Sequence, residues 1–146
     1  MSIPPLQSNG ELPPGEHFTT LNEIEAVYGC TNDRRKLLIR GLREAALNFS
    51  EAGVQRLWVN GSFVTDKEEP NDIDGCWEYM PSVNLEILDS VFLQHSRSAM
   101  KAKYCLDFFI ANIIEADSGL PFPKFFQFNR EGEPKGILVV RLGGNT

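Results

Sequence analysis

Cysteine and histidine, the usual ligands of structural zinc, are scarce in this chain of 146 residues. It has three cysteines and two histidines, and they do not form the closely spaced pairs that a zinc site requires. Cys30, Cys76 and Cys105 cannot all pair with one another. We therefore expect reduced thiols, as is typical of a cytoplasmic protein.

Long apolar stretches are also missing. A membrane-spanning helix needs about 20 predominantly apolar residues, and no run in the sequence approaches that length. Residues 1–15 are polar and rich in proline, without the apolar segment of a signal peptide. These two features predict a protein that stays in the cytoplasm and does not associate with membranes.

Basic residues are outnumbered by acidic ones. The chain has 14 Lys and Arg against 20 Asp and Glu, which gives a formal net charge of −6 at pH 7. Non-specific DNA binding depends on a basic face that neutralises phosphates, so we do not expect it here. A nucleotide ligand is still compatible with this charge, because a divalent metal can bring phosphates to an acidic site.

The remaining composition is that of a single globular domain. Hydrophobic residues make up 42% of the chain and charged residues 23%, enough for a core of ordinary size. Pro4-Pro5 and Pro13-Pro14-Gly15 indicate that residues 1–18 form an extended, proline-rich N-terminal arm. The domain itself is expected to span residues 19–142, followed by a tail at 143–146.

Apolar periodicity predicts three helices. The first is capped by Thr20 or Asn22 and ends at Tyr28, the second starts at Asn32 or Asp33 and ends near Ala52, and the third covers residues 83–95. The apolar face of the long helix consists of Leu38, Leu42, Ala45 and Phe49. Its basic side contains Arg34, Arg35, Lys36, Arg40 and Arg43. This side either guides an anionic substrate or is an ordinary solvated helix surface.

Short β-type segments predict a sheet. Strands are expected at residues 56–60 and 72–79 and around Asp107, with a C-terminal β-hairpin formed by residues 124–128 and 137–142. The fold class that follows is α/β (α+β), a mixed β-sheet flanked by helices in a single domain. Residues 96–103 are interpreted as a polar, basic connection between the third helix and the Asp107 strand.

The most informative stretch runs from the Gly61-Ser62 turn through a polar loop to Asp72-Ile73-Asp74. Side chains alternate between the two faces of a strand, so Asp72 and Asp74 point the same way. Two carboxylates on one face repel each other unless a cation lies between them, and an oxygen-only site suits Mg²⁺. A Gly-Ser turn also lets the backbone approach phosphate oxygens closely.

Asp107 is the third candidate ligand. It lies in an otherwise apolar strand, where an ionised carboxylate is costly without a hydrogen bond, a cation or a metal as its partner. Neighbouring strands are about 4.8 Å apart, so Asp107 on a strand beside Asp72 and Asp74 would complete a cluster of three carboxylates. We predict that these three side chains converge on one site.

These residues in this order resemble the signature of the polymerase-beta-like nucleotidyltransferase superfamily, and most of all its small stand-alone members from toxin–antitoxin and phage-defence systems. The similarity covers residues 57–110. The chain departs from the usual pattern at Asn60 and Gly75, where apolar residues are common, and it lacks an arginine shortly after Gly61-Ser62.

The resemblance implies an enzyme that transfers NMP from an NTP to a hydroxyl of a protein, RNA or small-molecule acceptor. It implies that Asp72, Asp74 and Asp107 bind Mg²⁺ or Mn²⁺ and are catalytic, and that Gly61 and Ser62 hold phosphates. A cognate toxin or antitoxin partner is implied as well.

Two features of the sequence each have two interpretations, the basic residues before Asp107 and the activity of the chain as a whole. Arg97, Lys101 and Lys103 form a basic cluster next to Asp107 that would contact a triphosphate, or they belong to a solvated loop. The chain as a whole is an active transferase, or a non-catalytic module of the same fold, antitoxin-like, that grips a partner protein. Retention of all three carboxylates favours the enzyme.

Overall fold

The computed structural model describes residues 3–93 and 97–142. Five strands form one mixed sheet in the order β1-β5-β2-β3-β4, which confirms the predicted α+β class. The strands are β1 (Gly15–Thr19), β2 (Arg56–Asn60), β3 (Ile73–Trp77), β4 (Leu106–Ile110) and β5 (Gly136–Arg141). β2 is antiparallel to both β3 and β5, whereas the β1–β5 and β3–β4 pairs are parallel.

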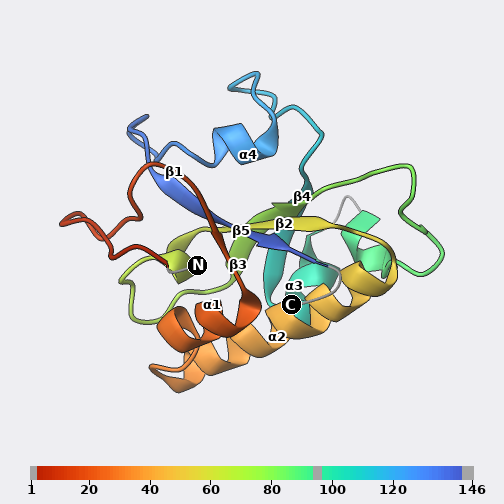
Figure 1. Ribbon diagram of the computed structural model, residues 1–146, viewed down its shortest axis with the longest axis horizontal. Helices are drawn as coiled ribbons and strands as arrows, with labels where there is room; N and C mark the ends of the chain where they lie inside the picture. The colour runs from red at the N-terminus through yellow and green to blue at the C-terminus, as the bar shows by residue number, and fades with distance from the viewer. Residues whose placement is uncertain (1–2, 94–96, 143–146) are drawn as a thin grey trace.

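Two of the predicted helices form where their capping residues place them. Helix α1 (Leu21–Tyr28) begins after Thr20, whose hydroxyl accepts from the Glu23 N–H, and α2 (Asp33–Glu51) begins after Asn32, whose side chain accepts from the Arg35 N–H. Such caps satisfy N–H groups that have no partner within the helix. Both helices, with α3 (Ser98–Tyr104), cover the same face of the sheet (Figure 1).

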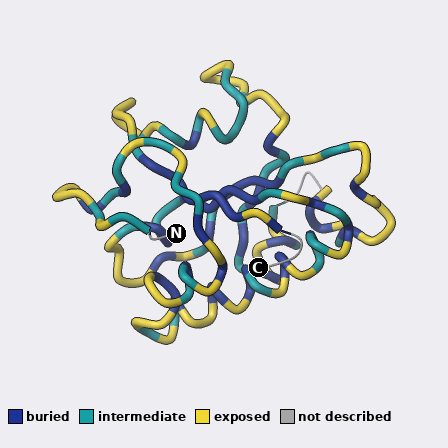
Figure 2. The backbone as a smooth tube through the Cα atoms, viewed as in Figure 1, coloured by how far each residue is buried: buried dark blue, intermediate teal, exposed yellow. Residues whose placement is uncertain are grey.

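The main core lies between these helices and the sheet. The predicted apolar face of α2 is fully buried there, and Leu57 and Val59 of β2 point into it. Trp58, between them in sequence, points to the other face and packs with Cys76, Ile137 and Val139. The buried part of the chain is therefore continuous through the centre of the sheet (Figure 2).

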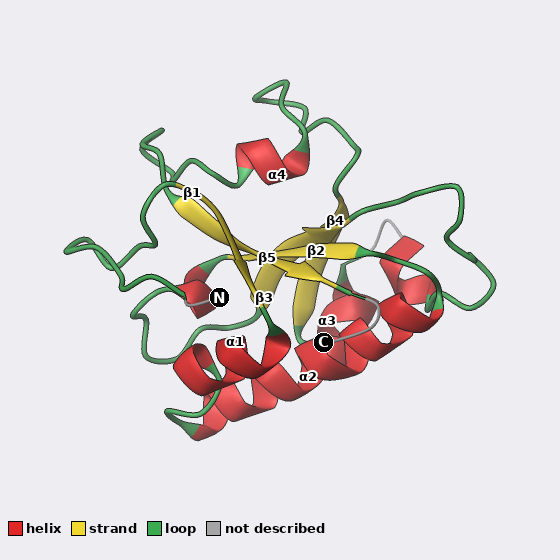
Figure 3. Ribbon diagram, in the orientation of Figure 1, coloured by secondary structure: helices red, strands yellow, loops and turns green. Residues whose placement is uncertain are grey.

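The second face is covered by α4 (Phe122–Phe125), which the sheet separates from the other three helices (Figure 3). This corrects the predicted C-terminal hairpin. Phe122 stacks on Phe109 at 4.4 Å between ring centroids, so the aromatic residues of this segment pack onto the sheet and do not join it. Of the expected hairpin, β5 exists as a strand in the sheet interior, and one isolated antiparallel bridge links Phe128 with Pro134.

The helix predicted at residues 83–95 is also wrong. Its described part is a set of turns ending in a short 3₁₀ helix, Ser90–Leu93, and its last two residues lie outside the described part. The side chains of Asn84 and Asp89 accept hydrogen bonds from backbone N–H groups two residues later, which competes with helix formation. Conversely, most of the expected connection at 96–103 is helix α3.

Residues 3–18 of the predicted N-terminal arm pack against the domain. Its last residues form β1, Leu12 is 1% exposed, and the Gly136 N–H donates to the Leu12 carbonyl. No helix among residues 3–93 and 97–142 combines the length and apolar character needed to cross a membrane. The tail predicted at 143–146 lies outside the described residues.

Candidate functional site

Three carboxylates converge where β3 and β4 run side by side. The parallel register places Asp74 opposite Asp107, and Asp72 directly precedes β3. Asp72, Asp74 and Asp107 each offer one oxygen, and these oxygens lie within 4.8 Å of one another. The predicted convergence of the three side chains is confirmed.

The electrostatics of this cluster disfavour three negative charges. The pKa of Asp74 is raised from 3.8 to about 7 by burial, then by the charges of Asp72 and Asp107 and by a hydrogen bond with Asp72. A divalent cation would relieve this repulsion, and an all-oxygen donor set fits Mg²⁺ or Mn²⁺. The three residues are thus chemically suited to hold either metal.

Two cations of the protein also lie at the cluster. Arg97 Nε donates to Asp107 Oδ1 at 2.7 Å, its guanidinium donates to the Phe108 carbonyl, and it lies 4.1 Å from the centroid of the Phe109 ring. Lys101 Nζ is 3.8 Å from Asp72 Oδ2 and 3.9 Å from Asp107 Oδ2. The sequence predicted Arg97 beside Asp107 as a triphosphate contact, and the structure pairs it with the Asp107 carboxylate itself.

Lys103, a predicted nucleotide-binding residue, is not at this site. Its Nζ forms an ion pair with Asp89 Oδ2 at 2.5 Å, and the Tyr104 hydroxyl donates to the same oxygen. Residues two apart on a helix point to opposite sides, so Lys101 and Lys103 cannot both face the carboxylates. Residues 98–104 form helix α3 where a loop was expected, and the helix directs the two lysine side chains to different sides.

The Gly61-Ser62 turn packs directly against the cluster. Gly61 has φ +86°, a conformation that glycine adopts without strain, and a Cβ at this position would lie 2.6 Å from Asp74 Oδ2. Ser62 begins a short 3₁₀ helix, Ser62–Val64. Glycine is required here both by its backbone conformation and by the closeness of the carboxylate.

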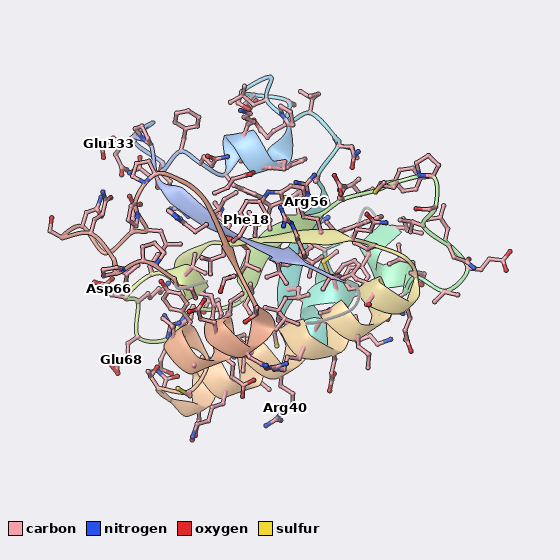
Figure 4. All side chains as sticks on the ribbon, in the orientation of Figure 1. Phe18, Arg40, Arg56, Asp66, Glu68 and Glu133 are labelled. Carbon is pink, nitrogen blue, oxygen red and sulfur yellow. The ribbon has the colours of Figure 1, made fainter. Side chains whose placement is uncertain are left out.

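Two arginines of α2 hold the loop between this turn and Asp72. Arg35, 4% exposed, donates to the carbonyls of Phe63 at 2.7 Å, Thr65 at 3.0 Å and Lys67 at 2.5 Å, and also to that of Tyr28. Arg34 donates to the carbonyls of Pro70 and Asn71. The basic side of α2 is therefore mixed, since Arg40 extends away from the sheet into solvent (Figure 4) whereas Arg35 is structural.

A cavity of about 660 Å³ adjoins Asp72 and Asp74. Its lining also includes Asn60, Gly61 and Ser62, and residues of the arm and of the segment before β5. Lys135 lies in that segment and its Nζ donates to Asn60 Oδ1. Burial lowers its pKa from 10.5 to about 8. Sequence reasoning treated this segment as a plain turn, and its only available signal was a lysine directly before a strand.

The fold and the site together define a single α+β domain with a half-buried carboxylate cluster at the junction of two parallel strands, beside a Gly-Ser turn. The chain belongs to the family described as "Family of unknown function (DUF6932)", whose sequence profile matches residues 4–141. Neither the curated proteins nor the solved structures contain a match to the chain.

Proposed function

We propose that the chain is a metal-dependent nucleotidyltransferase of the polymerase-beta-like superfamily. It transfers NMP from an NTP to a hydroxyl of a protein, RNA or small-molecule acceptor. The observation that carries this proposal is the convergence of Asp72, Asp74 and Asp107 on adjacent parallel strands, with the Gly61-Ser62 turn packed against Asp74. The setting in a toxin–antitoxin or defence system rests on the sequence resemblance, and the cytoplasmic location on the cysteine content and the apolar pattern of the sequence.

The three carboxylates would hold Mg²⁺ or Mn²⁺, which when bound neutralises the triphosphate and lowers the pKa of the acceptor hydroxyl. The Gly61-Ser62 turn offers a hydroxyl and closely approachable backbone to the phosphates. Arg97 occupies Asp107 Oδ1 and fixes that side chain, which leaves Oδ2 facing the cluster. The protein thus supplies orientation and charge, the two main requirements of phosphoryl transfer.

In the reaction the acceptor oxygen forms a bond to the α-phosphorus while the bond from that phosphorus to the α,β-bridging oxygen breaks. Pyrophosphate leaves with the electron pair of the broken bond. The acceptor proton passes to Asp107 Oδ2 and then to solvent. No covalent enzyme intermediate is needed, because the carboxylates and the turn act by position.

One observation favours the rival function, a non-catalytic module that grips a partner protein. Arg97 and Lys101 already compensate part of the charge on Asp72 and Asp107 without a metal. A cluster balanced in this way can persist as a structural element after activity is lost.

Transfer assays with each of the four α-labelled NTPs and Mg²⁺ separate the two functions. The protein and its co-purifying partners serve as acceptors, and labelled product and released pyrophosphate are measured. If the chain is an enzyme, label is transferred, and Asp107→Asn lowers the rate of transfer by at least about 100-fold because a charged ligand is lost. Asp117→Asn, the same change on an exposed residue, is the control. Absence of pyrophosphate release with every NTP, together with unchanged partner binding by Asp107→Asn, would establish the binding module.

A further inference from the structure

Lys135 occupies an unusual position for a lysine. It lies directly before β5. Because β5 is antiparallel to β2, the start of β5 lies at the same end of the strands as Asn60, the last residue of β2. Its Nζ donates to Asn60 Oδ1, and Asn60 directly precedes the Gly61-Ser62 turn. The ammonium group is therefore held beside the turn by a side chain that is itself 5% exposed.

This ammonium has unused hydrogen-bonding capacity. An ammonium group has three N–H donors. Among the described residues, one acceptor, Asn60 Oδ1, bonds to the Lys135 ammonium. Glu11 and Asp74 favour its charged form from a distance, but neither forms an ion pair with it in the described part of the chain. With a pKa of about 8 the group is still mainly a cation at pH 7. A half-buried cation with free donors at a cavity wall is a binding group for an anion.

Aromatic side chains also line this cavity. Phe128, 45% exposed, and the buried Phe126 line it, and both belong to the segment that leads to Lys135. Aromatic rings bind nucleobases by stacking, and this needs an accessible ring face. A volume of about 660 Å³ is in the range of cavities that enclose a small ligand. The lining of the cavity thus contains both a cation with free donors and an accessible aromatic ring.

We propose that this cavity binds a nucleoside polyphosphate, with the phosphates against Lys135 and the Gly61-Ser62 turn and the base against Phe128. The assignment rests on the proposed nucleotidyltransferase function and adds to it two binding residues that lie outside the carboxylate cluster. It gives the segment at residues 126–135 the role of substrate recognition. Lys135 contacts the phosphates in place of the predicted Lys103.

Protection from acylation tests the phosphate contact in the unaltered protein. Lysine labelling by an acetylating reagent is followed by mass spectrometry, with and without the tightest-binding of the four magnesium NTPs. We expect Lys135 to be protected at least about fivefold, because a bound phosphate covers its amine. Lys103, which is paired with Asp89 away from the cavity, should show no change. Equal labelling of Lys135 with and without nucleotide would overturn the assignment.

Variants distinguish the phosphate contact from the base contact. Lys135→Gln should weaken both magnesium NTP and magnesium tripolyphosphate about tenfold in calorimetric titrations, whereas Lys135→Arg keeps the charge and most of the affinity. Phe128→Ala should weaken the NTP about tenfold and leave tripolyphosphate within twofold, because that probe has no base. Lys124→Gln, an exposed lysine of α4, is the control. An equal loss of both probes in Phe128→Ala would contradict the base contact.

Failure of this inference is separable from failure of the proposed function. If the unaltered protein binds none of the four NTPs in Mg²⁺, both are wrong. If it binds an NTP and transfers label while Lys135 is neither protected nor needed for binding, the transferase function stands and the cavity assignment falls.

Discussion

Replacing Asp74 with asparagine removes one charge from the centre of the carboxylate cluster and keeps the shape of the side chain. The pKa of Asp74 is raised from 3.8 to about 7, which means that the folded state binds this proton more tightly than the unfolded chain does. The stabilisation of the folded state by this bound proton is complete below pH 4 and is lost as the pH rises through about 7. At pH 8 the metal-free protein therefore carries an unfavourable ionised carboxylate.

The size of the effect follows from the pKa. A rise from 3.8 to about 7 corresponds to about 4 kcal/mol at 1.36 kcal/mol per pH unit. Water screens a half-buried carboxylate, so we reduce the expected gain for Asp74→Asn to about 2 kcal/mol at pH 8. For a domain of this length, that raises the melting temperature by roughly 4–8 °C. At pH 4 the variant and the unaltered protein should differ little.

Thermal unfolding in a chelator at pH 4, 6 and 8, repeated at pH 8 with Mg²⁺, measures this directly. With Mg²⁺ at about 100 times its dissociation constant, the unaltered protein should gain about 2.7 kcal/mol, and Asp74→Asn should gain much less because it has lost a charged ligand. Asp117→Asn should follow the unaltered protein throughout. A variant that is no more stable than the unaltered protein at pH 8 in chelator, and that responds equally to Mg²⁺, would refute the assignment of Asp74 to a metal site.

Two further substitutions test how the site is supported. Arg35→Leu leaves four backbone carbonyls without their donor and should lower the free energy of unfolding, measured by urea titration, by about 3 kcal/mol. Arg40→Leu on the exposed side of α2 should change it by less than about 0.5 kcal/mol. Similar losses in the two variants would contradict the structural role of Arg35. Gly61→Ala places a Cβ 2.6 Å from Asp74 Oδ2 and should weaken Mg²⁺ stabilisation in thermal melts. Gly119→Ala has a comparable backbone strain at φ +72° with no atom within 4 Å, so a matching loss of the Mg²⁺ response there would refute the steric explanation.

The sequence was most informative where a local pattern has one physical solution. Asp72 and Asp74 were expected on one face because strand side chains alternate, and their oxygens do converge, with Asp72 just before β3. Asn32 was one of two candidate starts of α2, and its side chain caps the helix. Asp107 could be assigned because a carboxylate in an apolar strand needs a partner. In each case two or three neighbouring residues were sufficient.

The errors arose where contacts distant in sequence decide the outcome. Lys135 and Asn60 are 75 residues apart, and their contact depends on β5 inserting between β1 and β2, which no local pattern specifies. In the sequence Arg35 could not be told apart from its exposed neighbours on α2. Its acceptors are backbone carbonyls, which every residue has, so no particular partner residue marks it. The strand predicted at 124–128 has aromatic, strand-like composition, but its first two residues belong to helix α4, which has a proline in its first turn and packs on Phe109.

The two gaps of the motif differ in how freely evolution can change their length. The loop from Gly61 to Asp72 is fastened at several carbonyls by Arg34 and Arg35, so an insertion there would displace a fixed anchor. The crossover from β3 to β4 brings Arg97 and Lys101 to the cluster from its second half. The pairing of Asp74 with Asp107 is fixed by the register of the two strands, so the first half of the crossover can change in length without separating the carboxylates. A search for distant members of this family should therefore hold the first interval constant and let the second vary, or it will discard sequences whose carboxylates meet in the same way.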